Sequence, residues 1–336
     1  MIKKIGSRTV VFGVPVSIAS YAAIGGKKEK QGPIGKSFDM CFDDEMLGED
    51  SFEKAESRLQ QYAVNKALSK GGYTPEDMEM IFAGDLLNQC IGSTFGLMDF
   101  NIPFAGLYGA CSTMVLGLIM SSFAVTAGVK RVVAVTSSHF CSSERQFRFP
   151  LEYGGQRTPT AQWTATASGA AVVEQGTGNI QLVAATVGKI IDLGVSDANN
   201  MGAAMAPAAA DTIASFLSDS NTKPTDYDLI LTGDLGYVGS QLLYELLEKD
   251  GIDIRSVHND GGMMLYDREK QDVHAGGSGC GCIASALCGH ILPKIASGEL
   301  EKVLVCATGA LMSPTSSMQG ENIPSIAHLI YLKHQA

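Results

Sequence analysis

The chain has 336 residues, of which 45% are hydrophobic and 18% charged, and its formal net charge is −10 at pH 7. This composition is typical of a packed globular protein. The negative charge disfavours sequence-independent binding to nucleic acid and charge-driven docking on an anionic bilayer, since both need clustered lysine and arginine. The first residues lack the apolar core of a signal peptide, and no membrane-spanning run is seen.

The predicted elements alternate between helices and strands along the chain. Their expected bounds are a helix at 51–69, strands at 79–83 and 104–108, a helix at 112–127, strands at 131–136, 167–174 and 180–187, a helix at 203–217 and a strand at 228–231. Residues 142–159 read as a long irregular insertion. Alternation of this kind predicts a mostly parallel α/β architecture.

One passage occurs twice, at a constant offset of 149 residues. Residues 74–86 (TPEDMEMIFAGDL) and 223–235 (KPTDYDLILTGDL) share six of thirteen positions. We therefore predict two similar halves, residues 1–178 (with an insertion at 142–160) and 179–336, which form one compact unit. Two such halves side by side give a five-layer α-β-α-β-α arrangement. Ligands of α/β folds bind beyond the carboxyl ends of the strands, where both GDL copies and Cys111 should lie.

Cys111 lies in a small-residue turn that leads from a predicted strand directly into a helix. A thiol at the positive end of a helix dipole has a lowered pKa and becomes a better nucleophile. The alternative is a small buried residue on a tight turn, which is common for free cysteine. The eight cysteines lie mostly in apolar or glycine-rich stretches, as reduced buried cysteines do.

Asp85 and Asp234 occupy equivalent places in the two copies. Two carboxylates could hold a calcium ion, or each could cap the turn that follows it, and we favour capping. The pattern around Cys280, Cys282, Cys288 and His290 does not match a familiar zinc site, and no cofactor is predicted.

The insertion carries Arg145 and Arg148 close after His139. If it folds over Cys111, these side chains would supply cations for an anionic ligand. Otherwise the insertion is a solvated surface loop.

Several blocks together resemble the stage V sporulation protein AD family, within the thiolase and β-ketoacyl synthase III-like superfamily. They are Phe38-Asp39, AGDLLNQ (83–89), IPF (102–104), YGACST (108–113), TSSH (136–139), ERQFRFPLEYGGQ (144–156), MAPAAADTI (205–213), LTGDL (231–235), AGGSGCGC (275–282) and ATGALMSPT (307–315). In the related enzymes a nucleophilic cysteine works with a histidine and an asparagine, or with a histidine and a second cysteine. The resemblance implies a thiolase-like fold.

This sequence departs from the enzyme pattern at the positions of both residues that assist the nucleophilic cysteine. The position that resembles the histidine is Gly233, or Asp234 if the register shifts by one, and the position that resembles the asparagine is Gly277. Glycine has no side chain to transfer a proton or to stabilise an enolate. A non-catalytic pocket is therefore expected, unless His258 or His274 substitutes as the base. An active acyltransferase that uses Cys111 is the alternative.

The family resemblance implies binding of dipicolinic acid (pyridine-2,6-dicarboxylate), free or as a calcium chelate, for uptake into the developing spore. It also implies membrane-channel partners, a homodimer and a location on the cytoplasmic or forespore side of the spore inner membrane. The expected ligand-binding residues are Cys111, Asn88, His139, Arg145, Arg148, Gly233, Asp234, Gly277, Ser278 and Gly309. No nucleic-acid partner is expected.

Overall fold

The computed structural model describes residues 2–147 and 157–336. The elements of the first half are β1 (Lys3–Ile5), β2 (Thr9–Val11), β3 (Val16–Gly25), α1 (Lys27–Lys30), β4 (Met40–Cys41), α2 (Phe52–Gly71), β5 (Met80–Gly84), α3 (Ile91–Leu97), β6 (Phe104–Gly106), α4 (Thr113–Thr126), β7 (Arg131–Ser138), α5 (Phe140–Phe147), β8 (Trp163–Thr164) and β9 (Ala167–Gln175).

The elements of the second half are β10 (Ile180–Thr186), α6 (Met201–Ser220), β11 (Leu229–Thr232), α7 (Gly236–Glu248), β12 (His258–Asp260), α8 (Gly261–Leu265), β13 (Gly277–Ser278), α9 (Cys280–Ala286), α10 (Leu292–Ala296), β14 (Lys302–Ala310), α11 (Pro314–Met318) and β15 (Ser325–His334). Of the helices in residues 2–147 and 157–336, none combines the length and the apolar character needed to cross a bilayer.

The two halves have the same strand order. The first half runs β6-β5-β7-β9-β3 and the second runs β12-β11-β14-β15-β10. The two sets of strands meet where Gln181 of β10 pairs with Ser17 of β3. The repeated passage falls on β5 and on β11, which occupy equivalent places, so the duplication seen in the sequence is a duplication of structure.

Strand direction is more mixed than we predicted. β5 is parallel to β6 and to β7, but β9 is antiparallel to both β7 and β3, and the second half repeats this pattern. The reason is that β7 connects to β9 through α5 and β8 without the long crossover helix that a parallel neighbour requires. Four strands of each half still point the same way, so the carboxyl ends of β5, β6 and β7 meet at one edge.

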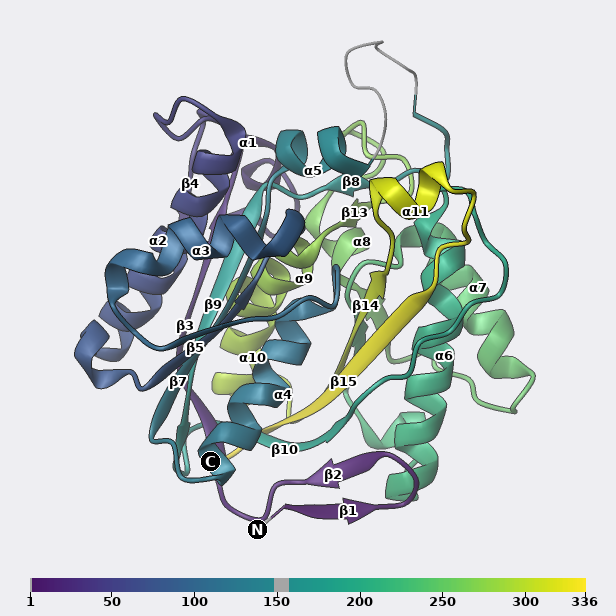
Figure 1. The fold of residues 1–336 in the computed structure, drawn as a ribbon. Helices are drawn as coiled ribbons and strands as arrows, with labels where there is room; N and C mark the ends of the chain where they lie inside the picture. The colour runs from purple at the N-terminus through teal and green to yellow at the C-terminus, as the bar shows by residue number, and fades with distance from the viewer. Residues whose placement is uncertain (1, 148–156) are drawn as a thin grey trace.

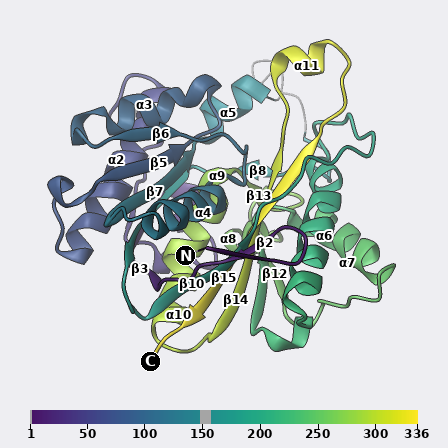
Figure 2. The ribbon, with the colours of Figure 1, turned by 60° about the horizontal axis from the view of Figure 1, so that its bottom comes forward.

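Five layers result, as predicted (Figures 1 and 2). Helices α4 and α9 lie between the two sets of strands, where Met114, Leu118 and Ile283 join one core cluster. Helices α2 and α3 lie on the outer side of the first set, and α6 and α7 on the outer side of the second. This arrangement explains why the strands of the centre read as nearly unbroken apolar runs, since they are covered on both faces.

The long outer helices α2 and α6 form for reasons that are visible in the sequence. The Ser51 side chain accepts a hydrogen bond from the backbone N–H of Lys54, and Asn200 caps α6 in the same way through Ala203. On α2, Ala55, Leu59 and Ala63 recur at helical spacing and are fully buried. The insertion begins differently from our prediction, because residues up to 147 are helical in α5.

Backbone contact at one glycine joins the second half to the turn that holds Cys111. A Cβ atom added to Gly309 of β14 would lie 2.2 Å from the carbonyl oxygen of Gly109. No side chain fits at that distance without a shift of the backbone. Gly309 therefore allows the loop after β6 to lie directly against β14.

We predict that Gly309→Ala lowers the free energy of unfolding by about 2 kcal/mol or more, because the added methyl group overpacks this contact. Urea denaturation measures the change. The matched control is Gly117→Ala in α4, where the nearest atom to the added Cβ is 3.5 Å away. That substitution should be neutral or stabilising, since alanine favours a helix by about 1 kcal/mol over glycine. Equal destabilisation by both substitutions would contradict the assigned contact.

Candidate functional site

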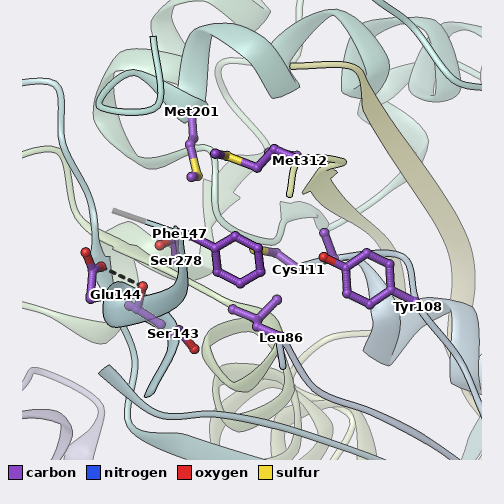
Figure 3. Close-up of a pocket in the computed structure, with 12 residues that line it drawn as sticks. Leu86, Tyr108, Cys111, Ser143, Glu144, Phe147, Met201, Ser278 and Met312 are labelled. Atoms are coloured by element: carbon purple, nitrogen blue, oxygen red, sulfur yellow. Dashed lines mark hydrogen bonds between the residues drawn. The ribbon is translucent and has the colours of Figure 1, made fainter. Parts of the chain in front are cut away.

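A narrow pocket lies over Cys111, at the carboxyl ends of the strands (Figure 3). Its cavity volume is about 30 Å³, below the range of small-molecule sites, so a ring-sized ligand needs the walls to move apart. Both halves and α5 contribute to the wall. The lining residues are Leu86, Tyr108, Ala110, Cys111, Ser143, Glu144, Phe147, Thr164, Met201, Ser278, Ala310 and Met312.

Local hydrogen bonds lock the turn that presents Cys111. The Ser112 hydroxyl donates to the Gly109 carbonyl at 2.6 Å, and the Thr113 hydroxyl donates to the Ala110 carbonyl at 2.6 Å. Ala110 has a φ of 49°, a left-handed conformation that is uncommon for a residue with a Cβ. Such strain persists only where surrounding contacts enforce it, and it is typical of functional turns.

The turn also uses backbone donors at the start of α4. The N–H groups of Ser112 and Thr113 donate to the carbonyls of Gly109 and Ala110. Backbone N–H groups at a helix start can bind an anion only when they point at it. These two groups do not serve a ligand in this way, because their hydrogen bonds are already made within the turn.

The Cys111 thiol interacts with Asp234 across the boundary between the halves. Asp234 is fully buried, and its carboxyl also accepts hydrogen bonds from the Thr308 hydroxyl at 2.7 Å and the Gly279 N–H at 3.3 Å. Burial raises the pKa of Asp234 to about 7, although the hydrogen bonds from Cys111 and Thr308 oppose the rise. The partner of this cysteine is thus a carboxyl group that exchanges its proton near neutral pH.

Helix α5 forms one wall of the pocket and rests on a buried polar network. Ser143, Glu144 and Phe147 point from it toward the pocket. The preceding residue, Ser142, donates to Glu56 at 2.7 Å, and Ser137 donates to the other oxygen of Glu56 at 3.1 Å. Glu56 is completely buried in α2. Its contacts hold α5 against the first half.

Two lining groups across from α5 are brought together by a short strand pair. β8 and β13 are parallel, with Ser278 paired to Thr164. The Thr164 hydroxyl donates to a Glu144 oxygen at 2.8 Å. The hydroxyl of Ser143 is buried and makes no hydrogen bond within the described residues. An unpartnered buried hydroxyl in a pocket wall is a candidate ligand contact.

Of the residues that we predicted for the site, the structure brings Cys111, Asp234 and Ser278 together and places others elsewhere. His139 is buried, with Nε2 2.8 Å from the Glu45 carbonyl and Nδ1 accepting from the Cys141 N–H. Asn88 is exposed and bonds to Gln146. Arg145 forms an ion pair with Glu53, away from the pocket lining. Arg148 lies outside the described residues.

The predicted glycines shape the site through packing and do not line it. A Cβ at Gly277 would meet the Tyr266 ring at 2.8 Å, and one at Gly233 would meet Ala307 at 3.2 Å. Gly309 contacts Gly109, as described above. These glycines therefore place the surrounding backbone, whereas we had expected Gly233, Gly277 and Gly309 among the ligand-binding residues.

Asp85 caps the turn after β5, as we favoured. Its carboxylate accepts hydrogen bonds from the backbone of Leu87 at 2.9 Å, and from the backbone and hydroxyl of Ser93 at 2.7 and 2.6 Å. Asp234 differs, because its partners are distant in the sequence. Within the described residues no three histidine, cysteine or acidic side chains are arranged to hold a metal ion.

Neither candidate base is placed at Cys111. His258 bonds to Thr232 at 2.9 Å through Nε2 and to Tyr244 at 2.8 Å through Nδ1, and burial lowers its pKa to about 4. His274 is paired with Asp272 at 3.3 Å. Both imidazoles thus have partners away from the pocket lining.

Sequence reasoning missed most of the lining, including Tyr108, Glu144, Phe147, Met201 and Met312. A signal existed for α5, because Ser143, Glu144 and Phe147 share one face of a helix at i, i+1 and i+4. We had predicted an irregular segment there, and so only its arginines were proposed as ligand contacts. The methionines carried no such signal, since they approach Cys111 only through the tertiary fold.

The fold places the chain in a known structural class. It is similar to a 3-oxoacyl-[acyl-carrier-protein] synthase III from Aquifex aeolicus VF5 (TM-score 0.57, 13% identity, 95% of this chain and 100% of that chain). It is also similar to human mitochondrial 3-ketoacyl-CoA thiolase (TM-score 0.60, 12% identity, 97% and 99% of the two chains). At these identities the likeness concerns the fold, which is thiolase-like.

The family follows from closer matches. The family model for stage V sporulation protein AD matches residues 6–333. The chain is 46% identical over 327 residues to stage V sporulation protein AD of Bacillus subtilis (strain 168), covering 97% of this chain and 96% of that protein. The chain belongs to the stage V sporulation protein AD family.

The buried carboxyl of Glu56 predicts a pH dependence of stability. Burial and the charge of nearby Asp85 raise the pKa of Glu56 from 4.5 to about 8. The folded state therefore holds this proton more tightly than the unfolded state, and folding stability falls as pH rises from about 4.5 to about 8.

We expect Glu56→Gln to remove this contribution, on the order of 5 kcal/mol between pH 4.5 and 8, so that its stability falls less than that of the wild type over the same pH range. Urea unfolding at a series of pH values measures the difference. Glu245→Gln, at an exposed position on α7, is the control and should follow the wild-type curve. Parallel curves for the wild type and Glu56→Gln would show that Glu56 does not titrate in this range.

Proposed function

We propose that this protein binds dipicolinic acid in the pocket over Cys111 and serves its uptake into the developing spore. The family membership and the family resemblance supply the identity of the ligand. The observation that carries the proposal is that no imidazole lines the pocket among the described residues, since Gly233 occupies the position that resembles the histidine of the related enzymes. A pocket of this superfamily without that base favours binding over condensation chemistry.

The polar groups of the lining suit the oxygens of a carboxylate ligand. Ser143, Ser278 and Tyr108 are neutral hydroxyl donors in the wall. Burial raises the pKa of Tyr108, with a further rise from Cys111, so its hydroxyl keeps its proton at neutral pH. Leu86, Phe147 and Met312 supply apolar surface for the ring.

Charge in the pocket favours the calcium chelate over the free dianion. The lining contains the carboxylate of Glu144 but no lysine, arginine or histidine among the described residues. A free dianion next to Glu144 and Asp234 meets like charges. Calcium neutralises the dianion and can accept a carboxylate oxygen as a further ligand, a role that Glu144 fits. We therefore expect calcium to arrive with the ligand.

Calorimetry with dipicolinate, with and without calcium, tests this proposal. We expect dipicolinate to bind more tightly with calcium than without it.

Ser143→Ala should weaken the binding of dipicolinate about fivefold, which corresponds to the loss of one hydrogen bond. Ser240→Ala is the matched control, because that hydroxyl is equally buried and makes no hydrogen bond to the described residues, but it lies on α7, away from the lining. Glu144→Gln should bind the free dianion more tightly and lose most of the calcium effect.

Benzene-1,3-dicarboxylate has the same outline but no ring nitrogen to chelate calcium, so calcium should improve its binding less. If calorimetry detects no heat of binding for dipicolinate, with or without calcium, dipicolinate is not the ligand. If the affinity is equal with and without calcium, the calcium chelate is not the bound form.

The second candidate function is acyl transfer by Cys111. The contact between the Cys111 thiol and the Asp234 carboxyl supports it, because a carboxyl with a pKa of about 7 can accept the thiol proton. On our proposal, incubation with acetyl-CoA and malonyl-CoA gives no Cys111 adduct at a catalytic rate by intact-mass spectrometry. Rapid acylation that disappears in Cys111→Ala, with Cys306→Ala as the control, would establish the enzyme instead.

A further inference from the structure

Cys111 has a second cysteine beside it at the floor of the pocket. Leu86, Cys111 and Cys280 form one buried contact cluster, against which Phe147 packs. The two thiols also influence each other electrostatically. Burial raises the pKa of Cys280 well above its usual range, and the strongest charge effect on it comes from Cys111. The described cysteines are all free thiols.

The two cysteines occupy corresponding places in the duplicated fold. Cys111 lies just before α4, and Cys280 is the first residue of α9. These are the two central helices, one from each half, and both lie between the two sets of strands. The pairing of these thiols is therefore a product of the architecture, because the starts of both helices meet at the boundary between the halves.

Access to the two thiols is unequal. Cys111 is 7% exposed and lines the pocket, whereas Cys280 is 0% exposed and donates to the Ser137 carbonyl at 2.9 Å. A small reagent that enters the pocket meets Cys111 first. Cys280 can then react only with a group already attached to Cys111. This is the arrangement of an attacked thiol and a resolving thiol.

We propose that Cys111 and Cys280 form a reversible disulfide when a peroxide enters the pocket. The Cys111 sulfur attacks one oxygen of hydrogen peroxide, the O–O bond breaks, and sulfenic acid forms at Cys111. The thiol proton passes to Asp234 and then to the departing hydroxide, which leaves as water. The Cys280 sulfur next attacks the Cys111 sulfur, the S–O bond breaks, and a second water carries away the hydroxyl with the Cys280 proton. Two thiols and one peroxide give a disulfide and two waters.

The disulfide would change the pocket at its floor. Cys111 would no longer donate to Asp234, and Cys280 would leave the Ser137 carbonyl. In a reducing compartment a disulfide of this kind is transient and responds to oxidants, unlike the permanent bridges of secreted proteins. The inference does not depend on the identity of the ligand, because it concerns the two sulfurs alone.

The test treats the full reduced chain with stoichiometric hydrogen peroxide, then blocks remaining thiols with N-ethylmaleimide under denaturing conditions. We expect the number of labelled cysteines to fall from eight to six. A non-reduced peptide map should show the link between the peptides of Cys111 and Cys280, and dithiothreitol should restore all eight. Dipicolinate bound over Cys111 should slow the oxidation. It should not change which two cysteines become linked, so the peptide map remains a valid readout.

Matched variants separate this pair from the other buried cysteines. Cys280→Ala should lose the link and retain sulfenic acid at Cys111, which a second equivalent of peroxide oxidises to sulfinic acid. Cys288→Ala and Cys306→Ala should keep the link, because those residues lie in other core clusters. Asp234→Asn should slow link formation about tenfold or more, the usual loss when a positioned base is removed. Circular dichroism checks that each variant is folded.

The wild-type map alone is decisive, whatever the variants do. A link between any other two cysteines, sulfinic acid at Cys111 with Cys280 still reduced, or no oxidation of Cys111 would each overturn the proposal.

Discussion

The contact between the Cys111 thiol and the Asp234 carboxyl is the interaction on which the site depends. One residue comes from each half of the duplicated chain, so the contact exists only when both halves have folded against each other. Asp234 is in turn fixed by Thr308 of β14 and by the backbone before α9. The geometry of the pocket floor is thus a direct product of the central helical layer and the strands on either side of it.

A second constraint comes from the amount of buried acid around the pocket. Glu56, Asp85 and Asp234 are all fully buried, and burial raises the pKa of each. Serine and threonine hydroxyls and backbone N–H groups surround these carboxyls, with no basic side chain among their hydrogen-bond partners in the described residues. A neutral or charge-compensated ligand suits such surroundings better than a bare anion.

Sequence reasoning predicted the layered fold because the duplication and the apolar strands are local signals. The repeated GDL passage identified β5 and β11, and it placed Asp85 and Asp234 correctly at the ends of equivalent strands. The strand directions were harder, because β9 reads as an apolar segment whose orientation depends on the connection that precedes it. Cys111 and Ser278 were found through motifs, whereas Tyr108, Met201 and Met312 reach the pocket only through long-range packing. Arg145 was misplaced because its charge suggested a ligand contact, while Glu53 lay within reach.

The packing at Gly233 has a consequence for any attempt to build a side chain there. Any side chain at that position begins with a Cβ 3.2 Å from the Ala307 backbone and 3.4 Å from Ile283. Ala307 and Ile283 would have to shift by a few tenths of an ångström to accept it, and both belong to the central core. A substitution at this position therefore changes the packing between the two halves before it changes the chemistry of the pocket.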